Sequence, residues 1–209
     1  LECALRGTSI VDQTVTEAIT SKGRIRADAY VVALGAYEPA LREHLGTPPL
    51  VYPVKGFSAT LPIVKQEAAP RHAGMDESKL IAYCPLGDRL RVTGGAELAG
   101  YAHSHAPEDF GRLYQAIEEL FPGATDHARA HTWACLRPMT PESTPRFGTG
   151  RYANLYFNAG QGHMGWAMAA GSARIVADLV SGRRPEIDLD GLRVDVYAID
   201  VVEQDALFF

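Results

Sequence analysis

The chain of 209 residues carries a formal net charge of −5, and its 46% hydrophobic and 22% charged residues are typical of a folded globular protein. Its length allows one large or two small domains. The negative charge, the lack of a basic cluster and the lack of an apolar run near ~20 residues argue against nucleic acid partners and transmembrane helices. Cys3, Cys84 and Cys135 are odd in number and widely spaced, which excludes a disulfide framework and a CxxC metal site and fits a reducing cytoplasm.

The N-terminal part of the chain is predicted to consist of strands. Residues 8–34 include β-branched stretches, and Ser21–Arg24 is expected to form a hairpin turn. The run Asp28–Gly35 is short and apolar and ends in glycine, which is typical of a strand buried on both faces of a parallel sheet. Gly35 therefore stands at the carboxyl end of a strand, where open α/β sheets bind ligands.

The middle of the chain is predicted to be rich in strands. The order expected there is one or two helical turns over 38–45, a long strand over 51–61 with a bulge or kink at Gly56, a loop over 65–78, strands over 80–84 and 90–94 joined by a turn at 86–89, and a small, flexible segment over 94–100.

Two helices are predicted in the second half. Residues 108–120 carry apolar side chains at helical spacing, with Pro107 in the first turn and a stop at Pro122. Residues 165–180 form the second helix, which Gly182 ends. One face of that helix consists of small residues that would let another backbone approach closely, namely Ala167, Ala170, Gly171 and Ala173.

We therefore predict an α/β (α+β) fold with two intertwined domains. Residues 1–49 and 135–194 would share one sheet, and residues 50–134 would form an antiparallel sheet that carries the helix over 108–120. Residues 195–209 are a tail of unknown role.

The run Asn158–Trp166 is the most informative stretch of the sequence. It follows a strand-like segment, contains glycines at 160, 162 and 165, and leads into a helix. Such a turn leaves backbone N–H groups unpaired at the positive end of a helix dipole, which suits a phosphate, a carboxylate or an electron-rich cofactor ring. It is neither a Walker loop nor the dinucleotide-binding fingerprint. A tight turn with close helix packing explains the same residues equally well.

Four segments in this order resemble a known family: Asp28–Gly35, Tyr52–Phe57, Leu136–Pro141 with Pro145 and Gly148, and Gly160–Trp166. Residues 88–100 and 181–186 add to the match. Together they resemble the C-terminal half of the D-amino acid dehydrogenase small subunit, within the FAD-dependent D-amino acid oxidase superfamily. The resemblance implies an FAD-binding, Rossmann-like domain, here incomplete, and a mixed-sheet substrate domain.

The resemblance also implies an activity. Members of this family oxidise D-amino acids to 2-oxo acids and ammonia by hydride transfer from the substrate Cα to flavin N5, and the dehydrogenases pass electrons to an acceptor such as a quinone. A cytoplasmic protein, peripheral on the bacterial inner membrane, is expected. A glycine- or sarcosine-type amine oxidase is the alternative within the class.

Substrate-binding residues follow from the resemblance. Arg137, in an Arg-Pro context, would hold the substrate carboxylate, because a guanidinium pairs bidentately with carboxylates. From the residues alone, a structural arginine bound to a loop carbonyl is the alternative. Tyr52, Lys55 and Tyr83 would face the active site, with ordinary core or edge aromatics as the alternative for the two tyrosines.

The cofactor contacts are implied in the same way. Ala33, Leu34 and Gly35 would lie under the ribityl or pyrophosphate part of FAD, although a routine strand-end turn explains these residues too. The flavin pyrimidine edge would lie against Gly160, Gln161, Gly162, His163, Met164 and Gly165. Many relatives have His in place of Gln161 and a small residue in place of His163. No metal site is predicted, since the pair His103 and His105 has no third ligand.

One departure from the family is large. The Gly-x-Gly-x-x-Gly turn that binds the ADP part of FAD has no counterpart here, and the sequence does not start with methionine. The chain therefore resembles about half of the enzyme. A non-catalytic fragment, or a subunit that a separate N-terminal chain completes, is the hypothesis from a second class.

Overall fold

The computed structural model describes residues 2–37 and 50–194. The helical turns predicted over 38–45 and the tail 195–209 lie outside the described residues. The chain divides into two compact units, Leu1–Tyr52 with Pro138–Phe209, and Pro53–Arg137. The cofactor and substrate roles that the sequence suggests for such units stay predictions.

The first unit begins with an antiparallel sheet of β1 (Leu5–Val11), β2 (Thr14–Thr20) and β3 (Gly23–Ile25). The predicted hairpin turn at residues 21–24 is confirmed, because Thr20 pairs with Gly23. A second two-residue loop joins β1 to β2, and its residues Asp12 and Gln13 both have positive φ, as a type I′ turn requires.

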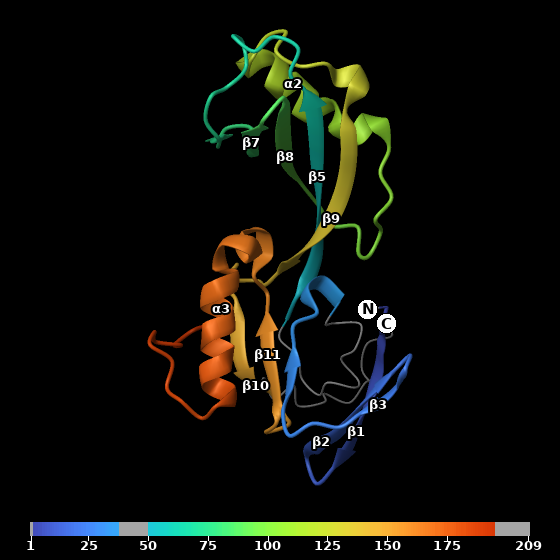
Figure 1. Cartoon of the computed structure of the whole chain (residues 1–209), viewed down its shortest axis with the longest axis vertical. Coiled ribbons are helices and arrows are strands. Elements are labelled where there is room, and N and C mark those ends of the chain that lie inside the picture. The colour runs from blue at the N-terminus through green and yellow to red at the C-terminus, as the bar shows by residue number, and fades with distance from the viewer. Residues whose placement is uncertain (1, 38–49, 195–209) are drawn as a thin grey trace, which may run out of the picture. The chain divides into compact units, whose positions relative to one another are not determined.

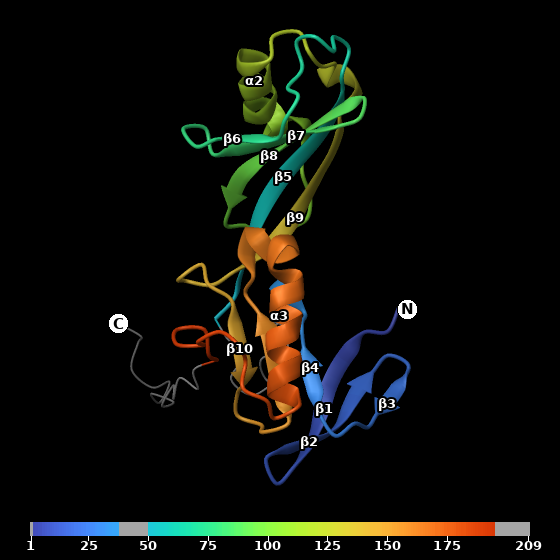
Figure 2. The same cartoon turned by 60° about the vertical axis from the view of Figure 1, so that its left-hand side comes forward.

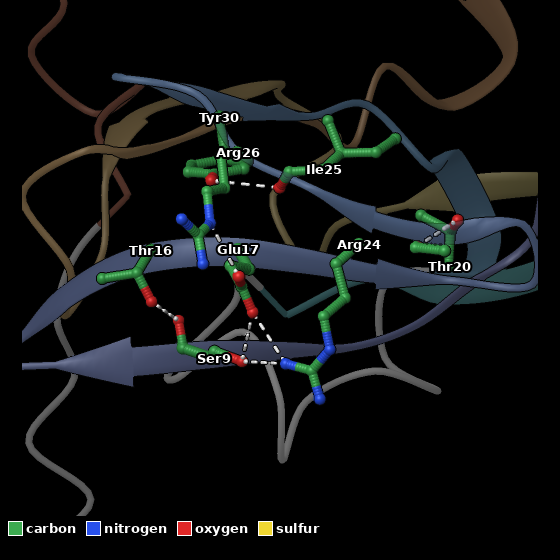
Figure 3. A network of polar contacts seen from close by, with 9 residues as sticks. Ser9, Thr16, Glu17, Thr20, Arg24, Ile25, Arg26 and Tyr30 are labelled. Atoms are coloured by element: carbon green, nitrogen blue, oxygen red, sulfur yellow. Dashed lines mark hydrogen bonds and ion pairs between the residues drawn. The ribbon is translucent and has the colours of Figure 1, made fainter.

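A charged network covers one side of this small sheet (Figure 3). Glu17 is 8% exposed, and each of its carboxylate oxygens accepts from one arginine: Oε2 from Arg24 Nη1 at 2.7 Å and Oε1 from Arg26 Nε at 2.8 Å. The Ser9 hydroxyl contacts both Arg24 and Glu17: it accepts from Arg24 Nη1 at 3.3 Å and donates to Glu17 Oε2 at 3.4 Å. These contacts lower the pKa of Glu17, chiefly through the hydrogen bond from Arg24.

The second sheet of this unit has the order β10 (Arg146–Thr149), β11 (Leu155–Ala159), β4 (Tyr30–Val32). Strand β4 runs parallel to β11, so the prediction that the first and last segments share a sheet is confirmed for β4, whereas β1, β2 and β3 form a sheet of their own. The prediction that β4 is buried on both faces is wrong, since Val32 is buried but Val31 is 50% exposed.

Helix α3 (Gly165–Val180) has the predicted bounds and lies beside β10 and β11 (Figures 1 and 2). Gly182 follows it with φ +68°, which confirms the predicted glycine stop. The small-residue face is not covered as expected: its members are exposed, and no described residue lies within 4 Å of a β-carbon placed on Gly171.

The two sheets of the first unit are joined through Asn154. Its Oδ1 accepts from the Val15 N–H at 3.0 Å, and its Nδ2 donates to the Val15 carbonyl at 2.8 Å. The side-chain amide thus pairs with β2 as another strand would. Beneath this contact, Val15 packs with buried apolar residues of β4 and β11, among them Val32 and Phe157.

The second unit is built on a five-stranded sheet with the order β6 (Gly74–Asp76), β7 (Ile81–Leu86), β8 (Arg89–Glu97), β5 (Tyr52–Pro62), β9 (His131–Met139) (Figure 2). The pairs β6–β7, β7–β8 and β8–β5 are antiparallel, as predicted. Two predictions are wrong here. The expected loop over 65–78 contains β6, and the segment over 94–100, expected to be flexible, continues β8 to Glu97.

One face of this sheet carries α2 (Gly111–Leu120), whose predicted position is confirmed. The turn before it, η2 (Pro107–Phe110), is a 3-10 helix rather than part of the α-helix. Alternate residues of β5 and β8 point into the core beneath α2, as a half-buried strand requires. The core side chains are Phe57, Ala59, Leu61, Ile81, Leu90, Val92, Phe110, Leu113, Ala116 and Ile117.

Candidate functional site

The predicted cofactor contacts of the first unit lie at one edge of its second sheet. Because β4 and β11 are parallel neighbours, with Val32 opposite Phe157, the segments that follow them emerge at the same edge. The first of these segments is 33–35, in which Ala33 and Leu34 are exposed and Gly35 has φ +58°. The second is the glycine turn 160–165. The structure therefore brings the two predicted segments together.

At the first two glycines of the turn, both the backbone conformation and the lack of space for a side chain favour glycine. Gly160 and Gly162 have φ of +71° and +57°, a region that side chains disfavour. A β-carbon on Gly160 would overlap the Thr140 methyl, and one on Gly162 would lie 3.0 Å from Met139 Sδ. This is the tight packing that the sequence left as one interpretation of the run.

The same turn also presents backbone donors. It forms η4 (Gly162–Met164), which leads directly into α3, and the first N–H groups of such a helix have no intrahelical acceptor. Gln161 is oriented by a 2.5 Å hydrogen bond from its Nε2 to Asn158 Oδ1. His163 and Met164 are exposed, and Trp166 is 96% exposed. The two interpretations of this run are thus compatible in one structure.

The five-stranded sheet of the second unit has two different faces. One is the apolar face under α2. The other, here called the polar face, carries the alternate residues of β5, which are Gly56, Ser58 and Thr60. Arg91 belongs to this face too, because its Nε donates to Thr60 Oγ1 at 3.0 Å.

Arg137, near the end of β9, lies on the polar face. Its guanidinium occupies the space in which a β-carbon of Gly56 would stand, and its Nη1 donates to the Gly95 carbonyl at 2.6 Å. The contact with a backbone carbonyl, which the sequence offered as the structural alternative, is therefore present. Within the described ranges 2–37 and 50–194, Arg137 forms no other hydrogen bond or ion pair, so the Nε and Nη2 donors have no acceptor there.

Two other predicted substrate contacts lie elsewhere. Lys55 is 4% exposed, and its Nζ lies 3.3 Å from Glu97 and over the Phe57 ring, which places it on the apolar face. Tyr83 is on that face as well, where its ring meets Phe121 edge-on at 5.0 Å. The structure does not bring either residue to Arg137, because side chains alternate between the faces of a strand.

Tyr52, the fourth predicted substrate contact, is the first residue of β5 and belongs to the first unit. Its side chain is 44% exposed. The substrate contact of Tyr52 stays a prediction.

The bulge predicted at Gly56 occurs, but its extra residue is in the neighbouring strand. Lys55 pairs with Glu97 and Phe57 pairs with Gly94. Gly56 therefore lies opposite two residues of β8, Gly95 and Ala96. Gly95 has φ +75°, as a glycine bulge requires. The sequence analysis missed the contact between Gly95 and Arg137. The doubled glycine at 94–95 within a strand is the signal that could have indicated a bulge there.

The second unit also contains a cavity of about 680 Å³ between α2 and the β7–β8 end of the apolar face. At its rim, Lys79 Nζ and Glu119 Oε2 are 2.5 Å apart, an ion pair that raises the pKa of Lys79 and lowers the pKa of Glu119. None of the predicted substrate-binding residues lines this cavity.

Comparison with known proteins identifies the class. Residues 2–179 match the FAD dependent oxidoreductase family (DAO), and the chain belongs to that family. It is 44% identical to D-amino acid dehydrogenase 2 of Mesorhizobium japonicum over 90% of this chain and 45% of that protein. It is 50% identical to the D-amino acid dehydrogenase of Methylobacterium radiotolerans over 88% of this chain and 44% of that protein. The chain thus spans about half the length of these relatives.

A solved structure agrees with the family at the level of the fold. Glycine oxidase from Geobacillus kaustophilus superposes with a TM-score of 0.80 at 21% identity, over 92% of this chain and 52% of that one. Within the described ranges, no helix is long and apolar enough to cross a membrane. The same residues contain no group of three His, Cys, Asp or Glu side chains placed to hold a metal ion.

Proposed function

We propose that this chain contributes to an FAD-dependent D-amino acid dehydrogenase, which converts D-amino acids to 2-oxo acids and ammonia. The observation that carries the proposal is the guanidinium of Arg137, held on the polar face with donors still available. An amino acid substrate always offers a carboxylate, and a guanidinium fork binds a carboxylate bidentately. The relatives named D-amino acid dehydrogenase support this substrate class.

In this proposal Arg137 binds the α-carboxylate through Nε and Nη2, while Nη1 stays on the Gly95 carbonyl. Fixing the carboxylate limits the orientations of the substrate Cα–H, which is the contribution that positioning makes to such a reaction. The substrate amine must be unprotonated when the Cα–H bond breaks, and the chain's own residues supply position and electrostatics.

The residues present fit the flavin end of FAD. We infer that the segments 33–35 and 160–165 would hold it, because both lie at one sheet edge and the second presents backbone N–H groups at a helix start. When bound, FAD supplies the two-electron acceptor for the hydride from Cα. The ADP end has no matching Gly-x-Gly-x-x-Gly turn in this sequence, so we infer that residues outside this chain hold it.

The electron acceptor and the location belong to the same proposal. A quinone is the proposed acceptor, and the relatives' designation as dehydrogenases supports an acceptor other than oxygen. We propose a cytoplasmic protein that is peripheral on the inner membrane, since electrons must reach a membrane-bound quinone pool. The lack of a Gly-x-Gly-x-x-Gly turn in this sequence supports the proposal of an N-terminal partner segment.

The test uses the purified chain and a chimaera in which it replaces the matching region of the Mesorhizobium japonicum relative. A flavin absorption spectrum shows whether either protein holds FAD. The chimaera is then assayed with D-alanine, glycine and sarcosine, using a dye acceptor and oxygen. We expect dye reduction with D-alanine, and a KM for D-alanine raised at least tenfold by Arg137→Ala but unchanged by the exposed control Arg89→Ala.

Either of two results would overturn the proposal. The first is a flavin-loaded chimaera without D-alanine oxidation. The second is an Arg137→Ala variant with wild-type KM. A chain that is colourless alone but yellow in the chimaera would support the need for a partner segment.

A further inference from the structure

We propose that Gly56 and the glycine bulge at Gly95 are positioning residues, which hold the Arg137 guanidinium in place before a carboxylate arrives. This inference rests on the proposed function, in which Arg137 binds the substrate. It goes beyond that function because it concerns two residues to which the proposed function assigns no contact with substrate or cofactor.

Position 56 has no room for a side chain. Gly56 is buried in β5 beside β9, and the flat guanidinium of Arg137 lies where any larger residue would place its β-carbon. Gly56 does not have a positive φ, so its backbone conformation does not call for glycine. Glycine is therefore required at this position because the arginine head group approaches the backbone closely.

The Gly95 carbonyl fixes one donor of the Arg137 guanidinium. In a regular antiparallel ladder, the carbonyls of β8 point along the sheet towards the neighbouring strands. The extra residue at the bulge interrupts the ladder and turns the Gly95 carbonyl out of it, so that this carbonyl accepts from Arg137 Nη1 at 2.6 Å. One donor of the fork is thereby fixed, which leaves the remaining donors in a defined orientation.

Side chains on the apolar face anchor the bulge. The Phe57 ring lies 2.9 Å from the position of a β-carbon on Gly95, so that this residue has neither the space nor the φ for a side chain. Lys55 lies over the same ring and pairs with Glu97 across the bulge at 3.3 Å. The arrangement on the apolar face therefore determines where the arginine lies on the polar face.

The consequence is a preorganised carboxylate site. Arginine loses considerable rotamer entropy when it is immobilised, and a site that holds it beforehand avoids that cost on binding. Preorganisation acts on substrate binding, so a loss of Gly56 should change KM rather than kcat.

The test compares Gly56→Ala with the matched control Gly111→Ala in the chimaera. Gly111 begins α2 with helical φ, and no described residue lies near its β-carbon position, so alanine fits there. We expect Gly56→Ala to raise the KM for D-alanine about tenfold to a hundredfold, the range for a lost charged hydrogen bond, with kcat within about twofold. D-alaninamide, which has no carboxylate, should show no such rise.

A double-mutant cycle separates positioning from a general structural role. If Gly56 acts through Arg137, then Gly56→Ala should have no further effect on KM in an Arg137→Ala background. An equal effect in both backgrounds, or an unchanged KM in Gly56→Ala alone, would overturn the inference. A wild-type chimaera without D-alanine oxidation would instead contradict the proposed function, so the two failures are distinguishable.

A second measurement needs no glycine variant and no activity. In the chain itself, the Nε–Hε signal of Arg137 is assigned by its disappearance in Arg137→Lys. We expect this group to be ordered on the ps–ns timescale without any ligand, unlike that of the exposed Arg6. An Arg137 signal as mobile as that of Arg6 would contradict the inference even if Gly56→Ala failed to fold.

Discussion

The side-chain amide of Asn154 forms both backbone hydrogen bonds of Val15, the N–H through Oδ1 and the carbonyl through Nδ2. A residue of the β10–β11 connection thereby replaces a strand partner for β2. The two residues are 139 positions apart in the sequence. This contact links the two sheets of the first unit, and the bond to the Val15 carbonyl depends on a single atom, the donating Nδ2 of Asn154.

Asn154→Asp replaces the donating nitrogen by an oxygen and leaves the Val15 carbonyl facing a carboxylate. We expect the free energy of unfolding to fall by about 2–3 kcal/mol, the cost of a buried polar group that loses its partner. Urea denaturation measures it. The control Gln66→Glu makes the same chemical change at an exposed side chain and should have little effect. Equal stability of the two variants would show that the amide does not join the sheets.

The carboxylate of Glu17 should make stability depend on pH. Its pKa is lowered in the folded state, so its stabilising effect is complete above the ordinary pKa of glutamate and is lost as the pH falls through the lowered pKa. Glu17→Gln should therefore lower the urea midpoint at pH 7 and reduce its decline towards acid pH. Glu77→Gln, at an exposed position, is the control. Parallel pH profiles for wild type and Glu17→Gln would contradict this.

Replacing Arg146 by lysine should lower the stability of the first unit. It is 9% exposed, and its guanidinium donates to the Gly191 carbonyl and, at 2.6 Å, to Glu142. A single ammonium cannot reproduce this planar pair of contacts. We expect Arg146→Lys to cost about 1–3 kcal/mol and to speed amide hydrogen exchange at Val194, which bonds to Phe147. Arg6→Lys should do neither, and unchanged protection of Val194 would count against the anchor.

Gly160→Ala should strain the turn after β11. Alanine at φ +71° is disfavoured, and its methyl would overlap Thr140, which is buried. We expect a loss of about 2–3 kcal/mol from the backbone strain and the overlap together. Gly171→Ala, within exposed α3, should instead stabilise by about 0.5–1 kcal/mol. Thermal unfolding of both variants tests this, and a neutral Gly160→Ala would show that the turn can relax.

Local sequence patterns predicted the elements whose ends are marked by turn or capping residues. The bounds of α3 follow from glycines at both ends, and the hairpin at residues 21–24 follows from its turn residues. The parallel pairing of β4 with β11 agrees with the apolar run before Gly35. The ends of α3 and the hairpin depend on residues that are close together in the sequence, whereas the pairing of β4 with β11 joins segments that are far apart in it.

Features that depend on distant neighbours were not predictable in this way. Whether Lys55 and Tyr83 share a face with Arg137 depends on the register of four strands, β7, β8, β5 and β9, and on the bulge between β5 and β8. The exposure of Val31 depends on what packs against one face of β4, which its own apolar run does not encode. The roles of the candidate residues rest on family resemblance more than on any local pattern.

Trp166 provides an optical consequence of the fold. The sequence contains two tryptophans, and Trp166 is 96% exposed whereas Trp133 is 40% exposed. The indole in the first turn of α3 should therefore emit at the long wavelengths of a fully hydrated fluorophore. Any molecule or segment that covers this helix start must shift or quench that emission, so the chain contains its own reporter of occupancy beside the glycine turn.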